Sequence, residues 1–137
     1  MRGATNAYAR SEPTITDIPI PTMINGITTS WWAAQKRDNI VYLNIELLNT
    51  AAISSNTGLF TMPAGAKPTK NIAGVFSALS SSKSDMPLVI EGGTGLVRSP
   101  WAFEGGNYYY EVNIAYPVDG GGRKLSRLLR LFRRRGA

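Results

Sequence analysis

Residues 40–48 have the sequence IVYLNIELL, and this short stretch is the clearest indication of the fold class. Its apolar side chains recur at a period of two and fall on one face: Val41, Leu43, Ile45 and Leu47. The opposite face holds Tyr42, Asn44 and Glu46. Successive side chains of a β-strand point to opposite faces, so this alternation predicts a strand with one buried face.

Two further stretches have β character. Residues 27–35 (ITTSWWAAQ) form a β-prone run, and the polar residues 36–39 (KRDN) that separate it from residues 40–48 predict a four-residue hairpin turn. Near the end of the domain, residues 107–116 (NYYYEVNIAY) alternate again. One face there holds Tyr108, Tyr110, Val112, Ile114 and Tyr116, and the other holds Tyr109, Glu111 and Asn113.

The remaining sequence adds shorter strands. We expect a short edge strand within residues 15–20 and a strand near residues 71–79. A hairpin is expected from MPLVIE (residues 86–91) through the GGTG turn to LVR (residues 96–98). Residues 49–58 predict a polar loop, and the next residues, with Pro63, Gly65 and Pro68, predict an irregular crossing. Six to eight short strands with no helical period before residue 120 predict an all-β domain, a small antiparallel β-sandwich or a jelly-roll-like barrel.

The chain divides into three parts. Its 137 residues suffice for one domain with its own core. Residues 1–23 contain Pro13, Pro19 and Pro21, which favour extended backbone, so they are expected to form an arm or linker. Residues 24–119 form the predicted β head, and residues 120–137 form a glycine linker followed by a basic tail.

The charge of the chain is concentrated in that tail. The formal net charge is +6, yet residues 120–137 hold seven cations and no acid, which leaves eight cations against nine acids in residues 1–119. After Gly120–Gly122, residues 123–135 predict a short amphipathic helix. Its apolar face holds Leu125, Leu128, Leu129 and Phe132, and its opposite face holds Arg123, Arg127, Arg130 and Arg134. Three interpretations stay open: an appended extension, a lipid-active peptide, or an assembly segment that docks on a partner. Membrane contact is expected only through residues 123–135, and no specific nucleic acid is expected.

Several classes of chemistry are disfavoured by composition. The chain has no cysteine and no histidine, which removes disulfides, thiol catalysis and the commonest general base and zinc ligand. No two carboxylates fall in a recognisable catalytic motif, and Gly92–Gly95 lacks the spacing of a phosphate-binding loop. We therefore predict a protein that is not an enzyme and that needs no cofactor or metal. The first residues carry no apolar signal segment, and no stretch approaches the ~20 apolar residues of a membrane span.

The order of these features resembles the head (tip) domains of phage tail receptor-binding proteins and tail fibres. The resemblance is carried by the strand at residues 39–48, the segment FTMPAGAKP at residues 60–68, the glycine-turn hairpin and the terminal tyrosine-rich strand. It covers roughly residues 24–119. Ala66 stands where an aromatic residue is common, and the chain continues past Asp119, where such heads usually end.

The resemblance implies a function and a setting. It implies a homotrimer of β heads in a phage tail, in contact with other tail or baseplate proteins and extracellular after release of the virion. Its ligand would be a cell-surface saccharide of a bacterial host, bound without catalysis. Two alternatives stay open: a structural virion or assembly protein of the same fold, and a membrane-active carrier that acts through its basic C-terminal helix.

Candidate saccharide-binding residues follow from the chemistry of sugars, because an aromatic ring stacks on the apolar face of a sugar while polar groups bind its hydroxyls. The candidate aromatic residues are Trp31, Trp32, Trp101 and Tyr109, and the candidate hydrogen-bonding residues are Asp85, Glu104 and Asn107. Neighbouring residues of a strand face opposite ways, so one of Trp31 and Trp32 is expected in the core and the other at the surface or in a subunit interface. Loop 98–107 is the favoured site, because loops carry binding residues disproportionately.

Overall fold

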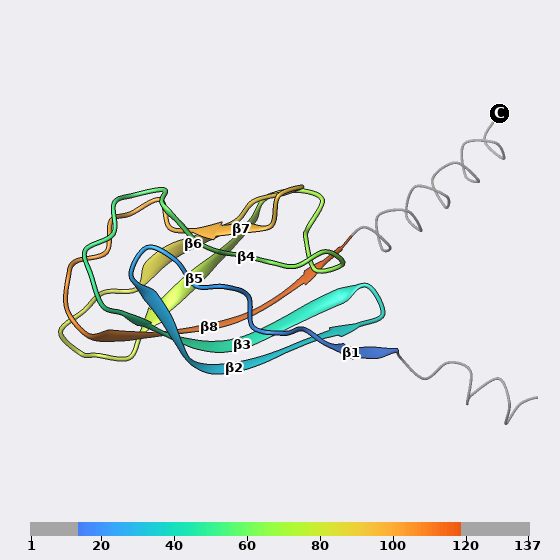
Figure 1. Cartoon of the computed structure of the whole chain (residues 1–137), viewed down its shortest axis with the longest axis horizontal. Helices are drawn as coiled ribbons and strands as arrows, with labels where there is room; N and C mark the ends of the chain where they lie inside the picture. Colours follow the sequence, from blue (N-terminus) through green and yellow to red (C-terminus); the bar gives the residue numbers. More distant parts are fainter. Residues whose placement is uncertain (1–13, 119–137) are drawn as a thin grey trace, which may run out of the picture.

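The head is a single antiparallel β-sheet that curls into a half-barrel (Figure 1). The structure, a computed structural model, describes residues 14–118; the first part of the predicted arm and the predicted C-terminal helix lie outside the described residues. Its eight strands are β1 (Ile15–Asp17), β2 (Ile27–Arg37), β3 (Ile40–Asn49), β4 (Gly58–Thr61), β5 (Ile72–Ala78), β6 (Met86–Ile90), β7 (Leu96–Arg98) and β8 (Tyr108–Pro117). The strand order across the sheet is β1-β2-β3-β8-β5-β6-β7-β4. The all-β, antiparallel prediction is confirmed.

The long strands β2, β3 and β8 are neighbours in the sheet and form one side of the half-barrel. The predicted buried and exposed faces of β3 and β8 are confirmed. In β3 the residues at alternate positions from Val41 to Leu47 are buried, and Tyr42 and Asn44 are exposed. In β8 Tyr110, Val112 and Tyr116 are buried, while Tyr109 and Asn113 are exposed. The register places Asn44 opposite Asn113 and Glu46 opposite Glu111. The sheet therefore has one face toward the core and one toward solvent, which we call the outer face.

The predicted turn between β2 and β3 is wrong in length. Lys36 and Arg37 belong to β2, where they pair with Val41 and Ile40, so only Asp38 and Asn39 connect the strands. Asp38 has a positive φ of 50°, a conformation that Asp and Asn tolerate best among non-glycine residues. Lys36 and Arg37 are polar and therefore suggest a turn. At the end of a sheet, however, their charged groups can reach water while their backbone continues the hydrogen-bonded strand pairing.

Strand β4 was not predicted. It lies across the boundary between the predicted loop 49–58 and the crossing that follows, and its four residues are too few to show a period. It pairs with β7 through Phe60 and Val97 and forms one edge of the sheet. The other edge is β1, which confirms an edge strand within residues 15–20, although the strand stops at Asp17 before Pro19.

A connecting segment lies between these two edges. Ile18 donates its backbone N–H to Ala34 of β2 at 3.0 Å, and Ile24 donates its own to Leu59 of β4 at 2.9 Å. Residues 18–24 therefore bridge the open side of the half-barrel with backbone hydrogen bonds at both ends, and the later part of the predicted arm lies against the domain.

Aromatic side chains organise the core between the two halves of the curled sheet. Phe103 makes edge-to-face contacts with Phe76 and Tyr110, at ring-centroid distances of 5.5 and 5.3 Å. Tyr116 is also buried, and its hydroxyl donates a 2.7 Å hydrogen bond to the backbone carbonyl of Ala66. Ala66 is itself in the core, so at this position the small side chain packs inside the domain.

Candidate functional site

Two loops that are far apart in sequence meet at one end of the head. The loop after β5 (residues 79–85) brings the Lys83 ammonium against the Glu104 carboxylate of the loop before β8, where they form an ion pair. The same ammonium lies over the ring of Tyr108, 4.3 Å from its centroid. The first loop is also bound to strand β8, because Leu79 donates its backbone N–H to the carbonyl of Tyr109 at 3.0 Å. We call this region the loop end.

The second loop is anchored on two buried residues. Ser99 accepts a 2.7 Å hydrogen bond from the backbone N–H of Asn56, and its hydroxyl accepts the N–H of Trp101 at 3.1 Å. Phe103 is 3% exposed and exchanges two backbone hydrogen bonds, of 3.0 and 2.8 Å, with Ile53. Trp101 lies between these anchors and is 58% exposed. Its ring is thus presented to solvent from a backbone that is fixed on both sides.

A small pocket of about 180 Å³ opens between the two loops. Its lining combines two hydroxyls, one ammonium, one carboxylate and the phenol of a buried tyrosine: Ser82, Lys83, Ser84, Met86, Ala102, Glu104 and Tyr110. Donors and acceptors of this kind can bind the hydroxyl groups of a polyol ligand.

The electrostatics of the loop end favour charged side chains at neutral pH. The hydrogen bond from Lys83 holds the pKa of Glu104 below its ordinary value of 4.5, and the same bond raises the pKa of Lys83 above 10.5. Burial raises the pKa of the Tyr110 phenol, which therefore stays protonated. Around neutral pH, Lys83 and Tyr110 therefore remain protonated hydrogen-bond donors, and Glu104 remains an ionised acceptor.

The structure brings several of the predicted residues to this end and separates others. Trp101, Glu104 and the exposed Asn107 lie on the second loop. Asp85 closes the first loop by accepting the backbone N–H of Ala78 at 2.9 Å, so its carboxylate shapes the loop. Tyr109 contributes its backbone here, but its ring belongs to the outer face of β8, opposite Tyr110.

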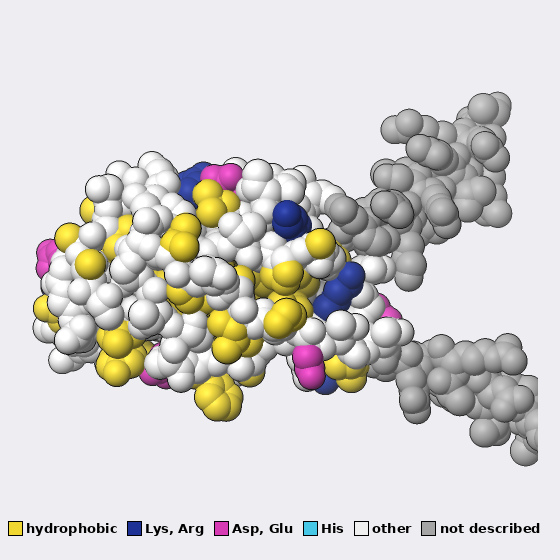
Figure 2. All heavy atoms as spheres, viewed as in Figure 1, with side chains coloured by type: hydrophobic (Ala, Val, Ile, Leu, Met, Phe, Trp, Pro, Cys, Tyr) yellow, Lys and Arg dark blue, Asp and Glu magenta, His cyan; other side chains and the backbone are white. Residues whose placement is uncertain are grey.

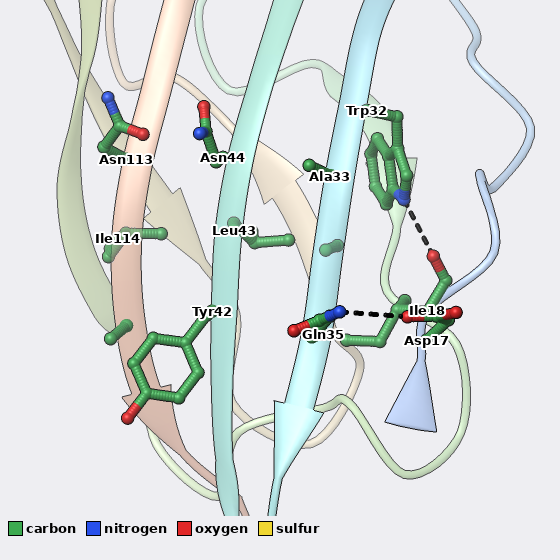
Figure 3. Close-up of a pocket in the computed structure, with 12 residues that line it drawn as sticks. Asp17, Ile18, Trp32, Ala33, Gln35, Tyr42, Leu43, Asn44, Asn113 and Ile114 are labelled. Carbon is green, nitrogen blue, oxygen red and sulfur yellow. Dashed lines mark hydrogen bonds between the residues drawn. The ribbon is translucent and has the colours of Figure 1, made fainter. Parts of the chain in front are cut away.

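The two tryptophans of β2 do not belong to the loop end. Trp31 is 57% exposed on the outer face, and Trp32 packs edge-to-face on Phe60 at 5.9 Å and is partly buried against the core. The Trp32 indole donates a 2.8 Å hydrogen bond to the carbonyl of Ile18 (Figure 3). The prediction that the pair point to opposite faces is confirmed. The Trp32 ring is partly buried and its N–H is bonded within the domain, and its role in saccharide binding stays a prediction.

Sequence reasoning missed a trough of about 810 Å³ on the outer face of β2, β3 and β8. Figure 3 shows Tyr42 and the amides of Asn44 and Asn113 along it, with Gln35 hydrogen-bonded to Asp17 at 3.2 Å. The exposed positions of β3 and β8 were predicted, but only the strand register shows that the two asparagines are neighbours. Lys83 was also missed, and its only signal was its position as the one cation of the polar loop 80–85.

Charged side chains are sparse on the face shown in Figure 2 and lie mostly toward its margin, between scattered apolar side chains. Within residues 14–118 no three His, Cys, Asp or Glu residues lie close enough to hold a metal ion. In the same range, no helix is long and apolar enough to cross a bilayer.

Comparisons with known proteins do not assign the chain to a family. No protein-family model matches the chain, and a search of curated proteins finds no significant match. The resemblance to phage receptor-binding heads therefore stays a prediction.

Proposed function

We propose that the head binds a saccharide at the loop end. The observation that carries this proposal is that one loop, fixed by backbone hydrogen bonds, holds both the exposed Trp101 and Glu104, whose carboxylate lines a polar pocket together with Lys83. A tryptophan face can stack on the apolar side of a pyranose ring, while charged and hydroxyl groups bind its hydroxyls. Because the loop backbone is already fixed by hydrogen bonds, binding need not order it, and this lowers the entropic cost of binding.

The binding is proposed to be non-catalytic. Saccharide hydrolysis needs a carboxylic acid that is protonated at the working pH, together with a second carboxylate at a defined separation. Lys83 lowers the pKa of Glu104, which keeps this carboxyl ionised and makes it a poor proton donor near neutral pH. Asp85, the other carboxylate of these loops, accepts a backbone N–H and serves the loop itself.

The proposed setting is the tail of a phage virion. The curled sheet would serve as the small jelly-roll-like head of a receptor-binding protein, which would assemble as a homotrimer with other tail or baseplate proteins. Its ligand would be a surface saccharide of a bacterial host. The order of sequence features along residues 24–119 supports this setting.

The test is a screen of the full chain against bacterial cell-wall and envelope saccharides, with Trp101→Ala as the diagnostic variant. We expect binding, and a loss of at least about tenfold in affinity (about 1.4 kcal/mol) for Trp101→Ala. Trp31→Ala is the matched control, because Trp31 and Trp101 are exposed to almost the same extent, 57% and 58%.

Two results would count against the proposal. A folded chain that binds neither saccharides nor intact host cells would favour a structural role in the virion. An equal loss of affinity in both tryptophan variants would move the site away from the loop end.

A further inference from the structure

The outer face of the sheet carries two opposed carboxylates. Trp31, Glu46, Glu111 and Ser77 lie in one row across β2, β3, β8 and β5, with the two glutamates directly opposite each other. Like charges at directly opposed positions destabilise a sheet. Glu46 accepts a hydrogen bond from Ser30 Oγ at 3.2 Å, and Glu111 accepts one from the amide of Asn113. Within residues 14–118 neither carboxylate has an ion-pair partner.

Apolar and small side chains lie on the same face. Trp31 and Tyr42 are both large and exposed, and the small side chains of Ala33 and Ala115 line the trough. Asn44 and Asn113 lie opposite each other between the Tyr42 end and the glutamate row. The face therefore presents Tyr42, with the Arg37 guanidinium over its ring, at one end, and Trp31 beside the two glutamates farther along the strands.

We propose that the basic segment at residues 123–135 of the same chain docks on this outer face. The head has almost no net charge, whereas the segment after Gly120–Gly122 holds seven cations and no acid. The glutamate row is complementary in charge to this segment, while a cation on the same face, Arg37, lies at its other end, 6.0 Å from the centre of the Tyr42 ring. Both surfaces also carry apolar side chains that are better buried. This inference does not depend on saccharide binding at the loop end.

The length of the segment fits the face. Strand β8 ends at Pro117, six residues after Glu111, and a β-strand rises ~3.3 Å per residue, so the glutamate row lies about 20 Å from that end. A helix over the 13 residues 123–135 is also about 20 Å long at ~1.5 Å per residue. The three glycines allow the chain to reverse direction between strand and helix.

The arrangement of the cations fits as well. In a helix of ~3.6 residues per turn, Arg133 and Arg135 lie on the two flanks of the apolar stripe that contains Leu128 and Phe132. With that stripe on the sheet, both arginines stand at the far end of the helix, where Glu46 and Glu111 lie. Arginine forms strong charge-assisted hydrogen bonds with carboxylates, so this end is expected to fix the register of docking.

The experiment uses the full chain with a spin label at Gly136→Cys, since the chain has no cysteine of its own. Paramagnetic broadening is measured in amide spectra. We expect strong broadening at Glu46 and Glu111, and clearly weaker broadening at Val89 on β6. Raising the salt from ~0.1 to ~1 M shortens the Debye length from about 10 to 3 Å and should weaken the broadening at least about twofold.

Charge reversal separates docking from mere proximity. Arg133→Glu with Arg135→Glu should abolish the broadening and leaves the head sequence intact. Adding Glu46→Lys and Glu111→Lys to that variant should restore it. Full-strength broadening in the tail variant, or no broadening at the two glutamates in the parent chain, would overturn the proposal. A mixture of labelled and isotope-enriched chains that shows the same broadening would also overturn it, in favour of docking on a second copy.

Discussion

The loop that presents Trp101 rests on one buried aromatic side chain, and its contribution to stability can be measured. Phe103 is buried beneath the loop that presents Trp101, with edge-to-face contacts to Phe76 and Tyr110. Phe103→Leu keeps an apolar side chain but removes both aromatic contacts, each worth about 0.5–1.5 kcal/mol. We expect the free energy of unfolding to fall by about 1–3 kcal/mol, with the loop end loosened first because its backbone is paired with Ile53 through this residue.

Equilibrium unfolding in urea is the assay. For an m-value of about 1–3 kcal/mol/M, a loss of about 2 kcal/mol lowers the midpoint by roughly 1 M, with m unchanged if the native state stays compact. The control is Trp101→Leu, two residues away in the same loop, which should change stability by less than about 0.5 kcal/mol because the ring is exposed. If the two variants lose the same stability, Phe103 does not anchor the loop and the reasoning is refuted.

Two further predictions concern a buried hydroxyl and an exposed ion pair. Tyr116→Phe leaves the buried carbonyl of Ala66 without its donor and should cost about 1–2 kcal/mol, seen as a lower Tm in a thermal melt; Tyr109→Phe, on the exposed face, should leave Tm unchanged. The Lys83–Glu104 contact should persist above pH 4.5, be lost as the pH falls through the lowered pKa of Glu104, and be lost again only when the pH rises through the raised pKa of Lys83. An NMR titration of the Lys83 side chain should show the acid transition, and its persistence in Glu104→Gln would assign it to another group.

The sequence was most informative where one face of a strand is buried. Period-two alternation in β3 and β8 predicted which residues face the core, because a one-residue slip would expose every apolar side chain of the strand. The alternation pattern could not reveal β4, because its four residues form a strand only through pairing with β7, where Phe60 lies opposite Val97. It also misplaced the β2–β3 turn, where charged residues continue a strand at the rim.

The candidate site was harder to predict, because it is built from pairings between distant segments. Loop 98–107 was chosen from its composition, and the structure confirms that Trp101 is exposed. Its polar partner Lys83 comes from a loop 21 residues earlier, and nothing in either loop alone indicates that the ammonium meets Glu104. The adjacency of Asn44 and Asn113 is likewise a property of strand register and not of either strand.

Exposure alone does not distinguish a binding residue from a docking residue, as Trp31 and Trp101 show. Their exposed fractions are nearly equal, so the difference must lie in what surrounds them. Trp101 projects from an anchored loop beside a pocket of hydrogen-bonding groups, which suits a small polar ligand. Trp31 lies on a sheet face in a row with opposed carboxylates, which suits an extended cationic and apolar partner. The two aromatic residues therefore imply two separate surfaces, and a substitution at one should leave binding at the other unchanged.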